Sequence, residues 1–302
     1  MVREATWSRI GTDVKSCMNI EEVLTKANLN YNVGLEEINC GEIFIPDKKA
    51  TIATLADGSK SYKGVVSNNY TICQNIDAFD FVNNINNEIT FEKAGETKTG
   101  MVYIIASLAP IEVFGDKITP YVILQNSHNG RYTFKATICP LRIVCQNQFN
   151  MSFKESPNTI SIIHSNLLEY KMEMAQQLLV GAADYMKDFK VEAEKMFNTK
   201  LSREQVFAVI DSFFKKSQED IDEMSARQTT IIEKNRENFI RCYNADDNQN
   251  FVGTKLGLVN AFTDFTTHKD VKEKSFDSRF LTVTFDPRLM NMFMQNVNAI
   301  AA

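Results

Sequence analysis

Residues 168–197 read LEYKMEMAQQLLVGAADYMKDFKVEAEKMF, and the apolar pattern of this stretch decides the fold. Its apolar side chains recur at alternating steps of four and three residues, which predicts one face of a single long α-helix. A Met-rich face of this kind is typical of a helix that packs under a sheet, and a coiled-coil partner face is the alternative. The predicted face comprises Leu168, Met172, Ala175, Leu179, Ala182, Met186, Phe189, Ala193 and Met196.

The sequence before this helix contains short, β-branched segments that predict antiparallel strands. Asp57-Gly58 and Asn129-Gly130 are signals for tight turns between such strands. A helical lead-in capped by Asn19 and a short helix over 75–87 interrupt the strands. The predicted strand segments are EIFIP (42–46), ATIATL (50–55), YKGVV (62–66), MVYIIASLA (101–109), PYVILQNS (120–127), RYTFKATI (131–138) and LRIVCQN (141–147).

The pattern is helical after residue 160. Ser202 and Gln205 form a capping-box signature for a second helix, residues 221–242 supply a third, and Asp286-Pro287 opens a last one. We therefore predict an α+β fold, with an antiparallel sheet in the N-terminal half packed by the long helix, and a helical C-terminal half. Residues 1–160 form the mainly β region with short helices and residues 161–302 the helical region, and we expect one compact unit.

The composition excludes several classes of protein. Hydrophobic residues make up 44% of the chain, and 12 Gly with 6 Pro are too few for extensive disorder. No run approaches the length of a membrane-spanning helix and the N-terminal residues are charged, so we expect a cytoplasmic protein without a signal peptide or membrane contact. The six cysteines contain no C-x-x-C pair, so we expect reduced, mostly buried cysteines and no zinc site.

No catalytic constellation is recognisable in the sequence. The chain lacks the H-E-x-x-H, P-loop and G-x-G-x-x-G motifs. Ser127-His128 has no nucleophile-elbow context, so we interpret residues 126–130 as a hydrogen-bonded hairpin turn. We predict no catalytic residue, no metal ligand and no cofactor, and a protein that acts by binding. The enzyme alternative requires His128 or Cys145 to meet carboxylates from distant segments.

Residues 117–154 contain no Asp or Glu, although the net charge of the whole chain is −5. Cations, rings and amides alternate there, which is the mixture that single-stranded nucleic acid requires for its phosphates, bases and base edges. Tyr121, Tyr132 and Phe149 are the rings that we expect to stack on bases. The alternative is a central hairpin with buried rings and cations that only reach water. The nucleic-acid-binding candidates are Lys117, Arg131, Tyr132, Lys135, Arg142, Gln146, Asn147 and Lys154.

Four blocks of the sequence resemble a known family. They are GVVSNNYTICQNIDAFDF (64–81), YVILQNSHNGRYTFKATICPLRIVCQNQFN (121–150), IIHSNLLEYKMEMAQQLL (162–179) and GLVNAFTDFTTH (257–268). From about Trp7 to His268, the chain resembles the phage/plasmid-like proteins of domain of unknown function family 932, although Ser8 stands where the family tends to have His. The resemblance implies a phage, prophage or plasmid product in the host cytoplasm, and no accepted activity. The element order is also similar to the core of the annealing proteins RecT and Redβ.

The leading hypothesis is a phage- or plasmid-encoded protein that binds single-stranded DNA and promotes annealing or recombination, as a homo-oligomer and without a cofactor. The alternative is a protein-interaction module that regulates or inhibits a host protein through its acidic helical half. A continuous exposed positive groove over residues 117–154 would favour the first hypothesis, and scattered cations would favour the second. The sequence leaves the choice between DNA and RNA open.

Overall fold

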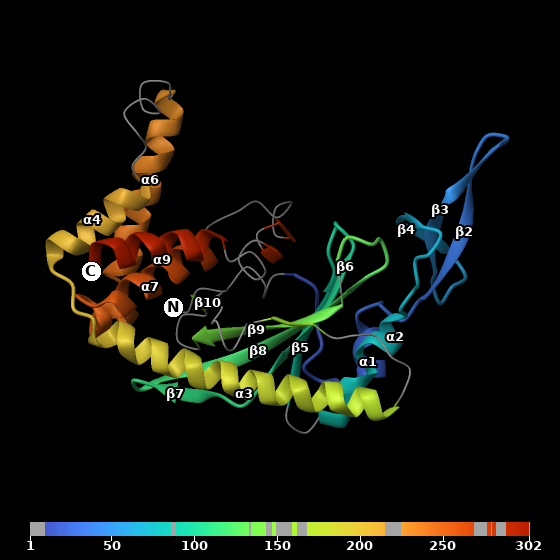
Figure 1. The fold of residues 1–302 in the computed structure, drawn as a ribbon, viewed down its shortest axis with the longest axis horizontal. Helices are drawn as coiled ribbons and strands as arrows, with labels where there is room; N and C mark the ends of the chain where they lie inside the picture. Colours follow the sequence, from blue (N-terminus) through green and yellow to red (C-terminus); the bar gives the residue numbers. More distant parts are fainter. Residues whose placement is uncertain are drawn as a thin grey trace.

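The structure is a computed structural model that describes residues 10–85, 89–132, 134–142, 147–148, 159–161, 168–214, 225–268, 277–278, 280–281 and 288–301. Figure 1 shows a large sheet with one long helix across it, a group of helices at one end and a narrow β-arm at the other. The N-terminal half supplies the sheets and the C-terminal half the helices, which confirms the α+β prediction.

The large sheet is antiparallel, and its described strands run in the order β1-β5-β6-β8-β9-β10, with β7 on β8 and β11 on β9. Strands β6, β8 and β9 form its centre, and their alternating side chains are buried on both faces. The strands are β1 (Thr12–Asp13), β5 (Thr90–Glu96), β6 (Met101–Ser107), β7 (Ile111–Val113), β8 (Asp116–Ser127), β9 (Lys135–Arg142), β10 (Asn147–Gln148) and β11 (Thr159–Ser161).

A second, three-stranded antiparallel sheet forms the β-arm, in the order β2 (Asn32–Cys40), β3 (Ile43–Thr54) and β4 (Lys60–Ser67). The predicted Asp57-Gly58 turn joins β3 to β4, with Gly58 at a φ of +81°. Strands β2 and β3 pair out to Cys40 and Ile43, but β4 pairs with β3 only as far as Lys48. The outer end of the arm is therefore a two-stranded ribbon, which Figure 1 shows projecting from the body.

The long helix α3 (Leu168–Asn198) is confirmed, and the described part of its predicted face is buried from Ala182 to Met196. The capping box at Ser202 and Gln205 is also confirmed, because each residue's side chain accepts a hydrogen bond from the other's backbone N–H. The remaining helices are α1 (Ile20–Lys26), α2 (Asn75–Phe79), α4 (Arg203–Phe214), α6 (Ala226–Tyr243), α7 (Lys255–Thr267) and α9 (Arg288–Ala301), with 3₁₀ turns at Asp80–Ile85 and Asp246–Phe251.

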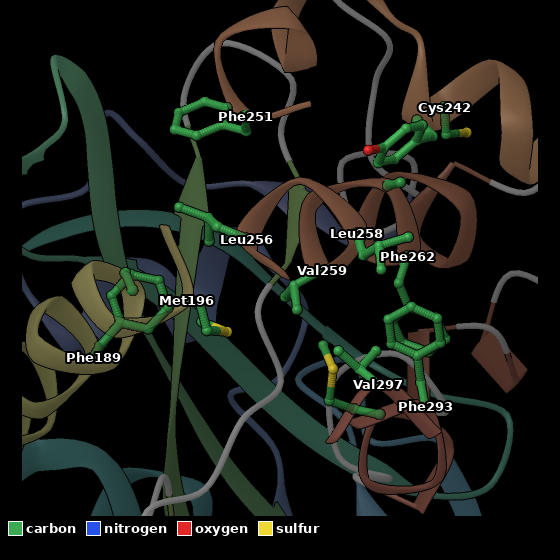
Figure 2. Close-up of a cluster of buried hydrophobic side chains, with 14 of the residues drawn as sticks. Phe189, Met196, Cys242, Phe251, Leu256, Leu258, Val259, Phe262, Phe293 and Val297 are labelled. Carbon is green, nitrogen blue, oxygen red and sulfur yellow. The ribbon is translucent and has the colours of Figure 1, made fainter. Parts of the chain in front are cut away.

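Two apolar clusters share α3. The first lies between one sheet face and the N-terminal helices, and it includes Leu124 of β8 and Leu178 of α3. The second surrounds the C-terminal part of α3, and Figure 2 shows it where α3, α7 and α9 meet. There the rings of Phe262 and Phe293 stack with centroids 4.3 Å apart. The helical half is therefore packed onto the sheet through α3.

A third cluster covers the opposite face of the large sheet, where Tyr103 of β6 contacts Phe280, with ring centroids 5.0 Å apart. Of the described cysteines, Cys17, Cys139 and Cys242 are buried, whereas Cys40 on the β-arm is exposed. Within the described part of the chain, no helix combines the length and apolar character needed to cross a membrane.

Candidate functional site

Three of the eight predicted nucleic-acid-binding residues lie at one end of the β8–β9 hairpin. Lys117 is exposed near the start of β8, and its neighbour Ile118 pairs with Arg142 at the end of β9. Asn147 of β10 pairs with Arg142 in turn. This end also brings an acid close, because Glu112 of β7 lies directly opposite Lys117 in the strand register. We call this end, with Lys117, Arg142 and Asn147, the Lys117 end.

Three others lie at the opposite end of the same hairpin. Arg131 is exposed in the loop that joins β8 to β9. Tyr132 is half-buried and its hydroxyl donates to Thr99 Oγ1 at 2.8 Å, so its ring is held against the body. Lys135 is half-buried, and burial lowers the pKa of its ammonium. Of the three, Arg131 is the residue best placed to meet a ligand.

The two ends are separated by the length of β8, roughly 30 Å at the rise of an extended strand. Gln146 and Lys154 lie outside the described residues, as does Phe149. The described cations of the 117–154 stretch therefore lie at two opposite ends of the hairpin and do not line one continuous groove. Taken alone, this separation favours the interaction-module hypothesis.

An exposed ring that we did not single out from the sequence, Phe114, stands next to the Lys117 end. Phe114 and Gly115 form the two-residue turn between β7 and β8, where Val113 pairs with Asp116. Both have positive φ, +52° and +79°, which is the backbone of a type I′ turn and favours Asn-Gly or Asp-Gly. A bulky residue in this conformation is strained, and strain of this kind often marks a functional position.

Phe114 is 43% exposed and begins a ladder of rings. Its ring lies 4.5 Å from that of Phe197 on α3, which in turn meets Phe251 edge-on at 6.0 Å. Lys200 places its Nζ 4.5 Å from the centroid of the Phe197 ring. We call Phe114, Phe197 and Lys200 the phenylalanine platform. A ring exposed beside two lysines, Lys117 and Lys200, can stack on a base while the lysines meet its phosphates.

A buried polar cluster joins the β-arm to the body at the far end of β8. The Tyr31 hydroxyl donates to Glu96 Oε2 at 3.0 Å, and Lys63 Nζ lies 2.6 Å from the same oxygen and 4.2 Å from the centroid of the Tyr31 ring. The Tyr31 ring also meets His128 edge-on, with centroids 5.8 Å apart. Burial and the nearby Glu96 raise the pKa of Tyr31.

His128 is 2% exposed, and its Nε2 lies 2.9 Å from Asn75 Oδ1. Asn75 Nδ2 donates to the Leu29 carbonyl, so Oδ1 is the acceptor and His128 Nε2 carries the proton. Its Nδ1 is buried without a hydrogen-bond partner among the described residues. Burial, with a smaller effect of the Lys63 charge, lowers the pKa of His128 to about 4, so the imidazole is neutral at pH 7.

This cluster bears on the enzyme alternative. It brings His128 together with a carboxylate from a distant segment, Glu96, through Tyr31, which contacts both. His128 is buried, and the contacts of the cluster join β4, β5 and the residue that follows β8. In the described part of the chain, no group of three or more His, Cys, Asp and Glu side chains is placed to hold a metal ion.

The predicted hairpin at residues 126–130 is part of this junction. Asn126 and Ser127 belong to β8 itself, and the loop that follows is longer than the tight turn that Asn129-Gly130 suggested. Side chains hold it closed, because Ser127 Oγ donates to the Tyr132 carbonyl at 3.0 Å and Asn129 Nδ2 donates to the Thr99 carbonyl at 2.8 Å.

Sequence comparison places this chain in a family without giving it an activity. The family model described as Domain of unknown function (DUF932) matches residues 63–283, which is most of the chain. No curated protein and no solved structure was found to match. The match begins within β4 and includes the large sheet from β5 onward, the long helix α3 and the phenylalanine platform.

Proposed function

We propose that this chain, which belongs to the DUF932 family of domains of unknown function, binds single-stranded DNA and promotes strand annealing or recombination without catalysing a reaction. It would act as a homo-oligomer in the cytoplasm of a host cell, as the product of a phage or plasmid. No cofactor takes part, because annealing requires only that a strand be held with its bases accessible.

The observation that carries the proposal is the exposed ring of Phe114, held in a strained turn on Phe197, with Lys200 over the Phe197 ring and Lys117 three residues further along the chain. Exposure of an apolar ring to water and a positive φ at Phe114 are both unfavourable in free energy. A role of the ring in binding would account for both. Stacking on an aromatic ring tolerates any base, as an annealing protein requires.

The order of the elements also supports the proposal. Strands β6, β8 and β9 are antiparallel neighbours, and the next long element in the chain is α3, which lies across them. This order is similar to the core of the single-strand annealing proteins RecT and Redβ, and the similarity is a fold-level analogy.

The helix that stands out furthest from the helical half is not acidic. Figure 1 shows α6 projecting from the body, and it contains four cations and two carboxylates. Arg236 is held by Asp211 at 2.8 Å, whereas Arg227 near the start of the helix is exposed. A docking surface for a host protein therefore gains no support from acidity at this helix.

Fluorescence anisotropy with labelled single-stranded and duplex oligonucleotides, each at two salt concentrations, tests the proposal. We expect salt-sensitive binding of single strands, preferred over duplex. The variant Phe114→Ala should weaken binding by about 1–3 kcal/mol, the contribution of one stacked base. The control is Met292→Ala, which shortens an equally exposed apolar side chain on α9 and should leave binding unchanged.

Binding to single-stranded RNA in the same assay decides the preference between the two nucleic acids. If the wild-type protein binds no single strand at either salt concentration, the nucleic-acid proposal fails. A capture experiment for a host protein then tests the interaction-module alternative.

A further inference from the structure

The ribbon at the end of the β-arm has an apolar face in solvent. Cys40 pairs with Ile43 and Ile38 pairs with Ile45, so strand alternation places these four side chains on one face. Ile43 is 71% exposed and Cys40 is exposed, whereas Ile38 and Ile45 are half-buried. A two-stranded ribbon is at best marginally stable in water, and an apolar patch of this kind usually contacts another surface.

The same chain has an apolar groove of about 870 Å³ in its body, between α3 and the β7 edge of the large sheet. Its walls are the segment that leads into β7, Pro120 of β8, and one side of α3. Its apolar lining includes Leu108, Ile111, Leu179, Ala183 and Met186.

The charges of the arm and the groove are complementary. The only charged residue in the turn and the paired end of the ribbon, residues 38–45, is Glu42. Lys187 and Lys190 are exposed where α3 borders the groove, and Glu112 is the one acid in its lining. An arm seated with its apolar face in the groove can place Glu42 beside these lysines. Glu112 offsets the charge of one lysine, so one positive charge remains for Glu42 to meet.

The arm cannot reach the groove of its own chain. Figure 1 shows the arm at one end of the long axis, whereas the groove lies under β7 and the middle of α3, towards the other end. The arm is also fixed to the body at its base, where Lys63 pairs with Glu96 and the Gln74 side chain bonds both the N–H and the carbonyl of Val33. The two surfaces can therefore meet only between copies.

We infer that the β-arm of one copy docks in the α3–β7 groove of a second copy, so that the chain assembles head to tail. When such a contact between two different surfaces repeats in one direction from copy to copy, it builds a ring or an open filament. The inference rests on the homo-oligomer of the proposed function and specifies its contact, but the assembly does not require DNA, so the assembly test and the DNA-binding test can fail separately.

Mixing two variants tests this arrangement. Ile43→Glu places a charge on the arm but leaves the groove intact, and Ala183→Glu places a charge in the groove but leaves the arm intact. By light scattering after size exclusion, the wild type should form species larger than a dimer and each variant should be monomeric. An equimolar mixture should form a one-to-one dimer, because one intact arm and one intact groove remain.

The control is Ile231→Glu, which changes an exposed isoleucine on α6, away from both surfaces, and should assemble like the wild type. Circular dichroism establishes that each variant is folded. A charge swap gives a further test. The arm variant Glu42→Lys and the double groove variant Lys187→Glu with Lys190→Glu should each weaken assembly. All three substitutions in one chain should restore it.

Cross-linking gives a second readout. The native Cys40 stands on the docking face of the arm, so the variant Ala183→Cys should give a ladder of cross-linked species with a short bismaleimide, and adding Cys40→Ser should abolish it. A wild-type protein that stays monomeric at every concentration overturns the inference. A Cys40–Cys40 cross-link that stops at the dimer also overturns it, because that result indicates an arm-to-arm contact.

Discussion

Gly64 of β4 lies so close to Asn129 in the β8–β9 loop that a Cβ on Gly64 would stand 2.5 Å from Asn129 Cβ and 2.8 Å from its Cα. The contact seats the arm on the body, because it joins the two sheets. Gly64→Ala should therefore lower the free energy of unfolding by about 1–3 kcal/mol, since backbone must move. The matched control is Gly34→Ala in β2 of the same sheet, where a Cβ would have nothing within 4 Å, and this variant should be neutral or slightly stabilising. Urea denaturation measures both.

Buried His128 makes stability depend on pH. Its pKa is about 4 in the folded chain against 6.5 in the unfolded one, so between these values the unfolded chain binds the extra proton. The free energy of unfolding should therefore fall by about 3 kcal/mol as the pH drops from 6.5 to 4. In His128→Gln, whose amide can still donate to Asn75, this part of the loss should disappear. Equal pH profiles for the two proteins would contradict the assignment.

The turn at Phe114 separates the role of the ring from that of the backbone. Phe114→Ala and Phe114→Asn both remove the ring, but Asn tolerates a positive φ better than Ala does. We expect the Asn variant to be more stable than the Ala variant by about 1 kcal/mol in thermal or urea denaturation. Both should lose the same amount of single-strand affinity. If affinity followed stability instead, the ring would have no direct part in binding.

The two ends of the β8–β9 hairpin should respond differently to the length of the strand. Lys117→Ala should weaken binding of short and long oligonucleotides and reduce the salt slope by about one unit. Arg131→Ala should do so only for strands long enough to cover the roughly 30 Å along β8. Arg142→Ala should behave like Lys117→Ala. Titrations over a series of oligonucleotide lengths measure the effect, and an Arg131 effect on the shortest bound strand would show that binding begins at the loop.

The sequence predicts those parts of the fold that are determined by residues close together in the chain. The helical spacing from Ala182 to Met196, the cap at Asn19 and the box at Ser202 depend on residues a few positions apart, and all three are present. Leu178 is a buried residue of α3 that the predicted pattern of alternating four- and three-residue steps does not include. It is 2% exposed while the predicted Leu179 is only half-buried, because a helix covered by both a sheet and other helices buries a face wider than a heptad stripe.

The sequence analysis missed the features that depend on contacts between residues far apart in the chain. Strand β2 contains Gly34 and two adjacent glutamates, so its composition is unlike a strand, and its pairing with β3 decides its conformation. The Tyr31, Glu96 and His128 cluster likewise assembles from segments far apart in the chain. Phe114 could have been found, because a Phe-Gly pair between Val113 and Asp116 occupies positions where a two-residue turn favours Asn-Gly.

Helix α3 is about 46 Å long at 1.5 Å per residue, and it contributes Leu178 to one apolar cluster and Phe189 and Met196 to the other. If one end of α3 frays, the other cluster loses rigid support, so both halves should melt in a single transition. Proteolysis within α3 would leave each fragment with only part of the helix and with an uncovered apolar face. We therefore expect that the chain cannot be divided there into parts that fold separately.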